Sequence, residues 1–600
     1  MRRGQRRLAP SIGVVLSLLL GPASGAGVEA QRSPDVRSAP AIAPDSAAVN
    51  RPAAAYSFLH AEQTPDALGP YFGPTSDGRP PNLVVIMVEG LGRSFSGPDA
   101  PLGSFTPFLD ELAGRSLYFE HFLSNQGRTF GVLPVLFGSL PLAEQGFTAL
   151  GDAMPPHAGL FNVLRRQGYR TAFYLGFNAS FDNMRTYLRK QGVDELIELR
   201  TFGGGYQRNP HSEWGYPDRE LIARVLADSA RLRAPFVVGM KTTSMHTVYK
   251  FPGQEEYLPK VEARLQALRM PEVSRASYRA QKEIYSAILY TDDQLRHYFE
   301  VAARQPWYAN TIFVITGDHR LAEIPQNTYL ERFHVPLLIH SPLLRRTARI
   351  GAVSSHLDVT PSLLALLANT YGLQRPAQVT WTGSGLDLHE GFRNLHEIPM
   401  KLAKTSVPDY VSGRWFLRDG QLWELQEGMR TGAVSEPRVR ALVAQRLQGY
   451  LQANTAFLQA KVLSPEGDTP ALVPYREATA TASGAVTITA PGLGIDGIRV
   501  TSGTDSIRVR VTFTNGDSQL SATFVPFLVL QRPDGRELQE RAGAPLRLMA
   551  RGRQEVILTL KSPSAGGRYY VSVRPSDPRT RRPVGRGRYR IPVDIAAGPS

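Results

Sequence analysis

NLVVIMVEG, at Asn82–Gly90, is a continuous apolar run that ends in one acid, Glu89. Two later stretches have the same form, APFVVGMKT at Ala234–Thr242 and NTIFVITGDH at Asn310–His319. Short runs rich in β-branched residues are typical of parallel strands that are buried on both faces. Between the second and third runs, Glu283–Arg304 carries apolar residues at helical spacing. Strands that alternate with helices predict an α/β fold with a doubly wound, mostly parallel sheet.

The sequence on either side of this core differs in residue composition and in hydrophobic periodicity. After about residue 480, runs such as SIRVRVTFTN alternate apolar and polar residues, with Gly and Pro between the runs. This pattern predicts a smaller β-sandwich domain over residues 480–600. Residues 31–78 are rich in Ala, Pro and Ser and have little periodicity, which predicts a disordered linker. The α/β domain is therefore expected over residues 79–465.

Residues 1–30 have the pattern of a signal peptide for export. Arginines precede the apolar run SIGVVLSLLLG, and small residues near Ala26 and Ala30 offer cleavage sites. The run is shorter than the ~20 apolar residues of a membrane-spanning helix. We expect a periplasmic or extracellular protein that is soluble after cleavage, with an uncleaved N-terminal anchor as the alternative. The chain has no cysteine, so it forms no disulfide and carries no cysteine-linked lipid.

The formal net charge of the chain is +15. One interpretation is a basic protein whose charges are simply solvated. The other is affinity for anionic material such as phospholipid headgroups, with peripheral contact to a membrane. The charge is not accompanied by any nucleic-acid-binding motif, so we expect no nucleic acid partner.

Ligand-type side chains follow each of the predicted strands. Glu89 ends the first strand, Asp318 and His319 end the strand from Ile312, and His246 follows the strand from Phe236. Since ligands of open α/β sheets bind beyond the carboxyl ends of the strands, these residues are expected at one edge. Taken singly, each of them is more often a loop or surface residue. Together they predict a site for a divalent metal such as Mn²⁺ or Zn²⁺.

Thr129 lies in SNQGRTFGVLPVLFGSLPL, at Ser124–Leu142. It opens a helix-like segment, and Pro134 predicts that this helix is short or kinked. A threonine hydroxyl is a poor nucleophile near neutral pH, and coordination to a metal lowers its pKa. From this segment alone, Thr129 is equally well interpreted as a helix N-cap.

The core resembles the lipoteichoic-acid-synthase-like, or phosphoglycerol transferase, branch of the sulfatase and alkaline phosphatase superfamily. The resemblance covers roughly Asn82–Leu373 and lies in the order and spacing of its motifs. These motifs are NLVVIMVEG, TPFLDELA, NQGRTFGVLPVLFGSLP, FDNM, WGYPDREL, KTTSMHTVY, YTDDQL, NTIFVITGDH, HVPLLIHSP and SSHLDVTPSLLALL.

The resemblance implies roles for individual residues. It implies one divalent metal, Mn²⁺ in most of this branch, with Zn²⁺ and Mg²⁺ as alternatives. The metal ligands that it implies are Glu89, Thr129, Asp318 and His319, with Thr129 also the covalent nucleophile. His246 would contact the substrate or assist the leaving group. Substrate-binding roles are implied for Arg128, Trp214, Asp182 and His246, and structural roles for His334, His340 and Asp358.

The reaction that the resemblance implies is a two-step displacement at phosphorus. An anionic phospholipid such as phosphatidylglycerol would pass its headgroup phosphate to Thr129. A glycan or other envelope acceptor, or water, would then take the group. The enzyme would thus be a phosphotransferase or a phosphodiesterase.

This chain departs from the family pattern in several ways. It has only a signal-like segment where the synthases carry membrane helices, and its C-terminal β domain is additional. Arg320 follows the Asp-His pair where many members have Gly, which predicts a change in pocket access or charge.

Three alternative functions remain at this point. A phosphoethanolamine transferase shares the metal set. A sulfuric ester hydrolase is disfavoured, because Thr129 lacks the Cys or Ser maturation pattern. A catalytically silent envelope-binding protein would keep the fold alone, although every expected ligand position is filled by a competent residue.

Overall fold

A computed structural model describes residues 57–460 apart from 230 and 407, residues 471–474, and residues 493–595 with gaps at 503–505, 516–520, 522, 533–535, 550–552, 564–566 and 579–588. The predicted signal peptide, and residues 31–56 of the predicted linker, lie outside the described residues. In the part that is described, no helix combines the length and the apolar character needed to cross a bilayer.

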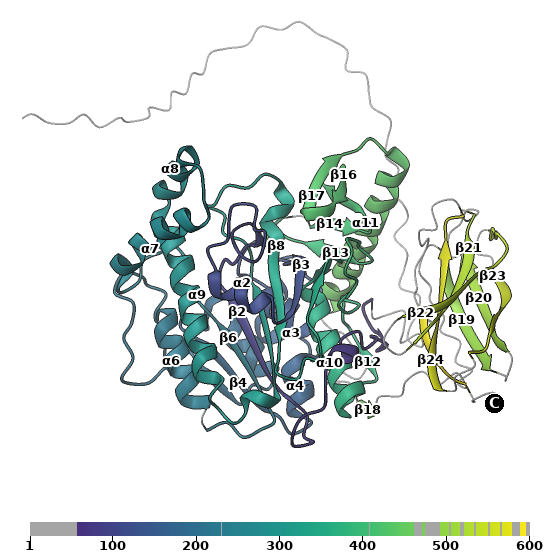
Figure 1. The fold of residues 1–600 in the computed structure, drawn as a ribbon, viewed down its shortest axis with the longest axis horizontal. Coiled ribbons are helices and arrows are strands. Elements are labelled where there is room, and N and C mark those ends of the chain that lie inside the picture. Colours follow the sequence, from purple (N-terminus) through teal and green to yellow (C-terminus); the bar gives the residue numbers. More distant parts are fainter. Residues whose placement is uncertain are drawn as a thin grey trace, which may run out of the picture. The chain divides into compact units, whose positions relative to one another are not determined.

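One large sheet, with nine strands among the described residues, forms the centre of the fold (Figure 1). Its order is β10-β3-β8-β7-β2-β6-β4-β5, and β9 also pairs with β3. The strands β7, β2, β6, β4 and β5 run parallel, whereas β8 is antiparallel to both of its neighbours. The strands are β2 (Asn82–Val88), β3 (Leu117–Leu123), β4 (Arg170–Leu175), β5 (Glu195–Ile197), β6 (Phe236–Lys241), β7 (Thr311–Gly317), β8 (His334–His340), β9 (Ala348–Ile350) and β10 (Ser354–Ser355).

Helices cover both faces of this sheet, so the predicted α/β fold is confirmed. In Figure 1, α6, α7 and α9 lie on one side and α3, α4 and α10 on the other. The helices are α2 (Pro107–Ala113), α3 (Val132–Gly138), α4 (Leu160–Arg165), α5 (Met184–Lys190), α6 (Asp218–Ser229), α7 (Gln254–Ala267), α8 (Glu272–Ala280), α9 (Lys282–Ala302), α10 (Val359–Tyr371) and α11 (Pro437–Ala460).

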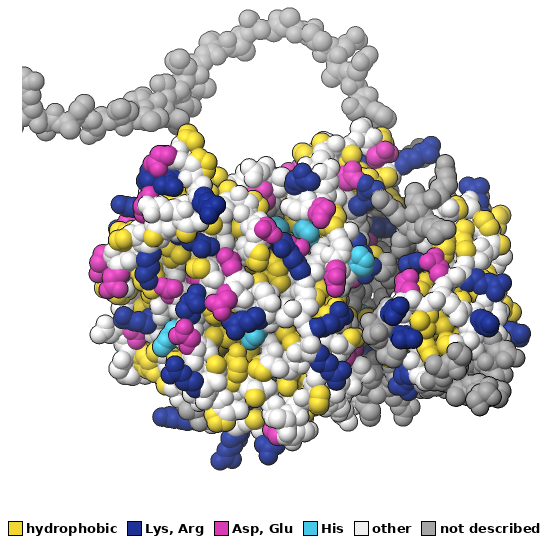
Figure 2. All heavy atoms as spheres, in the orientation of Figure 1, with side chains coloured by type: hydrophobic (Ala, Val, Ile, Leu, Met, Phe, Trp, Pro, Cys, Tyr) yellow, Lys and Arg dark blue, Asp and Glu magenta, His cyan; other side chains and the backbone are white. Residues whose placement is uncertain are grey.

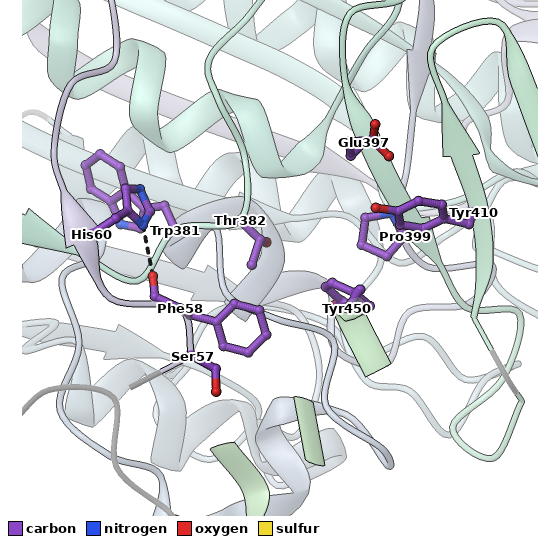
Figure 3. A pocket seen from close by; sticks show the side chains of 9 residues that line it. All are labelled: Ser57, Phe58, His60, Trp381, Thr382, Glu397, Pro399, Tyr410 and Tyr450. Atoms are coloured by element: carbon purple, nitrogen blue, oxygen red, sulfur yellow. Dashed lines mark hydrogen bonds between the residues drawn. The ribbon is translucent and has the colours of Figure 1, made fainter. Parts of the chain in front are cut away.

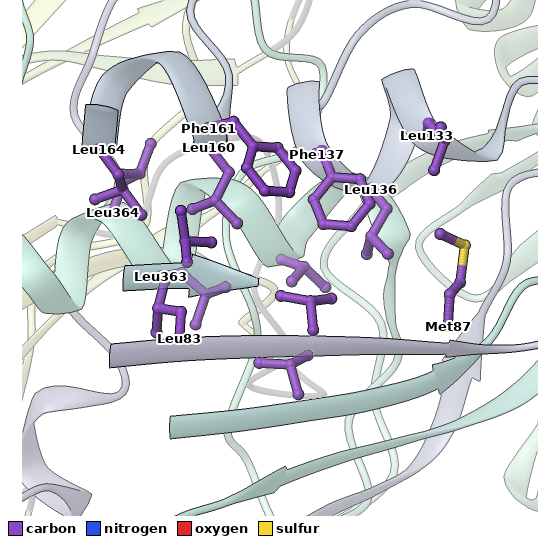
Figure 4. Packing of buried hydrophobic residues seen from close by; sticks show 14 of the residues in the cluster. Leu83, Met87, Leu133, Leu136, Phe137, Leu160, Phe161, Leu164, Leu363 and Leu364 are labelled. Carbon is purple, nitrogen blue, oxygen red and sulfur yellow. The ribbon is translucent and has the colours of Figure 1, made fainter. Parts of the chain in front are cut away.

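The burial of β2 explains its continuous apolar sequence. All of its residues are buried, and successive side chains enter opposite hydrophobic clusters. Figure 4 shows one of these clusters, in which Leu83 of β2 lies beside Leu363 of α10, and Met87 lies on the side of Leu133 and Leu136 of α3. The same cluster contains Leu68 and Phe72, so apolar residues of the predicted linker pack against the core.

A small antiparallel sheet that was not predicted follows the α/β core. Its order is β13-β14-β15-β16-β17. The strands are β13 (Glu397–Met400), β14 (Asp409–Ser412), β15 (Trp415–Arg418), β16 (Gln421–Gln426) and β17 (Arg430–Ala433). Two short strand pairs also occur, β1 (His60–Ala61) with β12 (Gln378–Val379) and β11 (Gln374–Pro376) with β18 (Leu472–Pro474).

The C-terminal region contains further antiparallel sheets, as predicted. One has the order β19-β20-β23 and the other β22-β21-β24-β25, and both contribute to a single hydrophobic cluster. The strands are β19 (Leu493–Ser502), β20 (Ser506–Asn515), β21 (Val525–Gln531), β22 (Glu537–Ala542), β23 (Arg553–Lys561), β24 (Gly567–Ser576) and β25 (Tyr589–Ile595). The exact domain boundaries stay predictions.

Candidate functional site

Three neighbouring parallel strands, β7, β2 and β6, deliver charged side chains to one edge of the sheet. Glu89 follows β2 directly, Asp318 follows β7, and Lys241 is the last residue of β6. All three residues are buried. The carboxyl edge of the sheet, where the sequence predicts ligand-type residues, is therefore densely charged.

The structure brings together the four residues that were predicted as metal ligands. His319 Nε2 lies 3.4 Å from Glu89 Oε1 and 3.7 Å from Asp318 Oδ2. Thr129 Oγ1 lies 3.2 Å from His319 Nε2 and 3.4 Å from Glu89 Oε2. Potential ligand atoms of four residues, from three segments of the chain, thus surround one small volume.

The spacing and chemistry of these atoms fit a divalent cation. Ligands held about 2.1 Å from one tetrahedral ion lie about 3.4 Å from each other, which matches the distances above. Asp318 Oδ1 accepts the N–H groups of Gly90 and His319, whereas the buried Oδ2 accepts no backbone N–H and faces Lys241 Nζ and His319 Nε2. His319 Nδ1 lies 3.0 Å from the Arg320 carbonyl oxygen, so Nε2 faces the cluster. Two carboxylates, an imidazole and a hydroxyl suit Mn²⁺, Zn²⁺ or Mg²⁺.

Lys241 is a member of this cluster that sequence reasoning missed. Its Nζ lies 2.5 Å from Glu89 Oε2 and 3.0 Å from Asp318 Oδ2. Burial opposes its charge, but the carboxylates of Asp318 and Glu89 outweigh burial and raise the pKa of Lys241. The apolar run predicts the strand that carries Lys241. Because lysine is not a usual metal ligand, the pattern of ligand-type residues does not include it.

The electrostatics of the site favour an ionised Glu89. Burial opposes its negative charge, but Lys241 and His319 hold the pKa of Glu89 well below its usual range. Burial likewise opposes a charged His319, and Asp318 and Glu89 overcome it and raise the pKa of this imidazole. A cation at this site would therefore take the place of the His319 proton.

Thr129 does not begin a helix, contrary to the sequence prediction. The helix α3 starts at Val132, and its N-cap is Gly131 with φ 67°. This left-handed residue breaks the helical path, so Thr129 lies in a loop before the helix. The predicted shortness of the helix is confirmed, since α3 ends at Gly138.

Backbone contacts to β13 and its following residues support the Thr129 loop. The Gly127 N–H donates to the Lys401 carbonyl at 2.8 Å, and Gln126 forms a parallel bridge with Lys401. A Cβ at position 127 would lie 2.9 Å from Leu402 Cδ1 and 3.1 Å from Leu402 Cα. Glycine is needed at this position because the two backbones approach closely.

Asp182 also supports the Thr129 loop, through the backbone of Gly131. Its Oδ2 accepts the Gly131 N–H at 2.7 Å and the Thr148 hydroxyl at 2.9 Å. Its Oδ1 pairs with Lys404 Nζ at 2.6 Å. These contacts assign Asp182 to the support of the loop, and its substrate-binding role stays a prediction.

The other predicted substrate residues lie outside the cluster of ligand atoms. His246 is half-buried, and its ring packs 4.2 Å from that of Trp214. His246 Nδ1 lies 3.0 Å from the Thr247 carbonyl oxygen. Arg128, next to Thr129, is exposed. The roles of these three residues in binding a substrate stay predictions.

Asp218 is a second buried charged residue that was not predicted. Its Oδ1 accepts the N–H groups of Thr243 at 2.7 Å and Ser244 at 3.1 Å, and its Oδ2 accepts the Thr291 hydroxyl at 2.7 Å. Asp218 thereby fixes the segment between β6 and His246. Asp218 lies in the motif WGYPDREL, but no local pattern marks it as an anchor.

Several buried polar residues of the sequence motifs support the fold. Arg320 does not alter pocket access, because its fully buried guanidinium donates to Ser94 Oγ and to the carbonyls of residues 321, 324 and 325. His334 and His340 bind backbone carbonyls, as expected for structural residues. Asp358 accepts the N–H groups of Ser355 and Ser384, which confirms its structural role.

Figure 3 shows an open pocket elsewhere in the protein. Its lining includes Phe58, Trp381, Tyr410 and Tyr450, and His60 Nδ1 lies 2.9 Å from the Phe58 carbonyl oxygen. The pocket contains none of the predicted site residues. The candidate site is therefore defined by the charged cluster at the sheet edge.

Residues 81–370 match the sulfatase family model. The chain is similar to lipoteichoic acid synthase-like YvgJ of Bacillus subtilis (strain 168), with 20% identity over 305 residues, 48% of this chain and 47% of that protein. It is also similar to phosphoglycerol transferase I of Citrobacter koseri, with 21% identity over 257 residues, 40% of this chain and 30% of that protein. The chain spans about half or less of these relatives.

Among solved structures, the fold is similar to that of a protein in the alkaline phosphatase superfamily from Vibrio parahaemolyticus. The TM-score is 0.50 and the sequence identity 19%, and the match covers 69% of this chain and 93% of that one. This likeness supports the fold.

Proposed function

We propose that this chain, whose residues 81–370 match the sulfatase family model, is a metal-dependent phosphotransferase or phosphodiesterase with Thr129 as its nucleophile. The observation that carries the proposal is the convergence of Thr129 Oγ1 with Glu89, Asp318 and His319. Export to the cell envelope is part of the proposal and rests on the N-terminal sequence pattern.

The residues of the chain have distinct parts in the proposed reaction. Glu89, Asp318, His319 and Thr129 would hold one divalent cation, Mn²⁺ by family resemblance. When bound, this ion lowers the pKa of the Thr129 hydroxyl and offsets charge on the phosphoryl oxygens. The Thr129 hydroxyl would pass its proton to solvent water, Thr129 Oγ would bond to phosphorus, and the bond from phosphorus to the leaving alcohol would break. Water or an acceptor hydroxyl then takes the phosphoryl group from Thr129.

The leaving alcohol needs a proton, and we propose that His246 supplies it. Since Nδ1 of His246 faces the Thr247 carbonyl, Nε2 is left for the substrate. Trp214 packs against this imidazole and fixes its orientation. Arg128 is exposed beside Thr129 and would bind phosphoryl oxygens through its guanidinium.

For the donor we propose a phospholipid with a phosphoglycerol-type headgroup, and for the acceptor a glycan or other envelope hydroxyl. The names of the relatives, a phosphoglycerol transferase and a lipoteichoic acid synthase-like protein, support this choice. The exposed guanidinium of Arg128, next to Thr129, also supports a donor with an anionic headgroup.

A covalent adduct tests the proposal. The full chain with Mn²⁺ is incubated with labelled phosphatidylglycerol, and in parallel with phosphatidylethanolamine, and is then analysed by peptide mass spectrometry. We expect a phosphoglycerol adduct on Thr129 that is absent in Thr129→Ala and kept in the surface control Thr455→Ala.

The other outcomes separate the alternatives. An adduct from phosphatidylethanolamine alone would indicate the phosphoethanolamine transferase. Absence of both an adduct and a bound metal would favour an envelope-binding protein. Release of sulfate from an aryl sulfate without any phospholipid adduct would favour the sulfuric ester hydrolase.

A further inference from the structure

Lys241 is an unusual residue for the interior of a sheet. Its residue exposure is 0%, and lysine is almost never fully buried without a partner. In the register of the two strands it lies opposite Met87 of β2, two residues before Glu89. Its partners are Glu89 and Asp318, which are the two carboxylates proposed to hold the divalent cation.

Glu89 and Asp318 thus contact the Lys241 ammonium, which is part of the protein, and would also bind the divalent cation, which can exchange with solvent. Together they carry two negative charges, and the Lys241 ammonium balances one of them. A divalent cation on the same carboxylates would lie close to this ammonium, and like charges at short range in a buried site repel strongly. The presence of Lys241 must therefore weaken the binding of the cation.

The same charge also acts on the nucleophile. Thr129 Oγ1 is 3.4 Å from Glu89 Oε2, the oxygen that Lys241 Nζ contacts at 2.5 Å. With both cations present the cluster carries more positive than negative charge. A positive potential at Thr129 attracts an anionic phosphodiester and offsets the charge that develops on its phosphoryl oxygens.

We propose that Lys241 is a positioning residue that lowers the affinity of the site for its divalent cation and raises the positive potential at Thr129. The inference rests on the proposed function, because it requires a cation on Glu89 and Asp318. If Lys241 only held Glu89 and Asp318 in place, its substitution would instead disorder these carboxylates and weaken cation binding.

The test compares Mn²⁺ affinity with reactivity in the full chain. Calorimetric titration with Mn²⁺ alone at pH 8 is expected to show at least tenfold tighter binding in Lys241→Met than in the wild type. At saturating Mn²⁺, the rate of adduct formation on Thr129 is expected to fall at least tenfold. Lys260→Met removes the same charge from the surface of α7 and should change neither value.

Different results would overturn the proposed role of Lys241, its effect on Thr129, or the proposed function. Equal or weaker Mn²⁺ binding by a folded Lys241→Met would overturn the proposal for Lys241 while leaving the cation site intact. Tighter binding with an undiminished adduct rate would overturn the effect on Thr129. If the Met variant does not fold, Lys241→Gln keeps a donor to Glu89 without the charge and must give the same two changes. Absence of any Mn²⁺ or Zn²⁺ binding by the wild type would instead overturn the proposed function.

Discussion

Thr129 is held by residues that never contact its hydroxyl. Its loop is tied to Lys401 through the Gly127 N–H and to Asp182 through the Gly131 N–H. A displacement of about 1 Å at a nucleophile can cost about two orders of magnitude in rate. The residues that hold this loop are therefore expected to affect catalysis through geometry.

Asp182→Ala tests this expectation. The substitution leaves the Gly131 N–H without its acceptor, which should cost about 1–3 kcal/mol in the free energy of unfolding. The rate of Thr129 adduct formation at saturating lipid should fall at least tenfold, with Mn²⁺ affinity within twofold of wild type. Lys404→Met, which removes only the ion pair to Oδ1, should have a smaller effect. A raised KM with unchanged kcat would instead show that Asp182 binds the substrate.

Gly127→Ala tests the close approach of the loop to residue 402. The added Cβ meets the backbone of Leu402 as well as its side chain, so the loop must shift. We expect a loss of about 1–3 kcal/mol in unfolding free energy, measured by urea denaturation. Leu402→Ala in the same chain should not restore stability, because its Cα stays. Gly204→Ala, where nothing lies within 4 Å of the added atom, is the matched control.

At the scale of the elements, the strands that could be predicted from the sequence are those whose burial leaves a clear apolar pattern. The strands β2, β6 and β7 were predictable because both of their faces are buried, which makes them continuous apolar runs. The alternation in β20 was predictable because Ile507, Val509, Val511 and Phe513 all face the core. The metal-ligand candidates followed from the rule that functional residues lie at the carboxyl ends of such strands.

The elements that escaped prediction lack such a signal. The strands β13, β14 and β15 have four residues each, too few for a period of two to stand out. The loop at Thr129 has no local signal, because Gly131, which separates it from α3, is held by a tertiary contact to Asp182. Lys241 was missed because its importance lies in partners from two other strands.

The packing of α9 against α2 gives a prediction on pH. Asp292 of α9 accepts the N–H groups of Phe108 at 2.7 Å and Leu109 at 3.0 Å, and burial raises the pKa of its carboxyl to about 7. In the unfolded chain this group titrates near pH 4. Between these values the folded protein holds a proton that the unfolded chain has lost, so the contribution of Asp292 to stability decreases as pH rises from 4 to 7.

Urea unfolding at pH 5 and pH 8 measures this slope. Asp292→Asn has no ionisable group there, so its stability should fall less between the two pH values than that of the wild type. Identical differences in the two proteins would contradict a raised pKa in the folded state. The slope also serves as a reporter of the α2–α9 contact, because exposure of Asp292 would abolish it.

At the scale of the whole molecule, net charge matters more than any single patch. The chain carries 68 Lys and Arg against 53 Asp and Glu. Figure 2 shows basic side chains scattered over the drawn face, with acidic ones among them. Such a distribution favours weak, long-range attraction to anionic surfaces over a specific docking site.

Vesicle binding tests whether this charge brings the protein to its proposed lipid. The full chain should co-sediment with phosphatidylglycerol-containing vesicles at 50 mM salt and dissociate by 500 mM, because the Debye length shrinks from about 14 Å to about 4 Å. Zwitterionic vesicles should bind it weakly at either salt concentration. Thr129→Ala should bind as the wild type does, since the attraction comes from the surface rather than from the site. Binding that survives high salt would contradict an electrostatic origin, and loss of binding in Thr129→Ala would show that the active site itself holds the membrane.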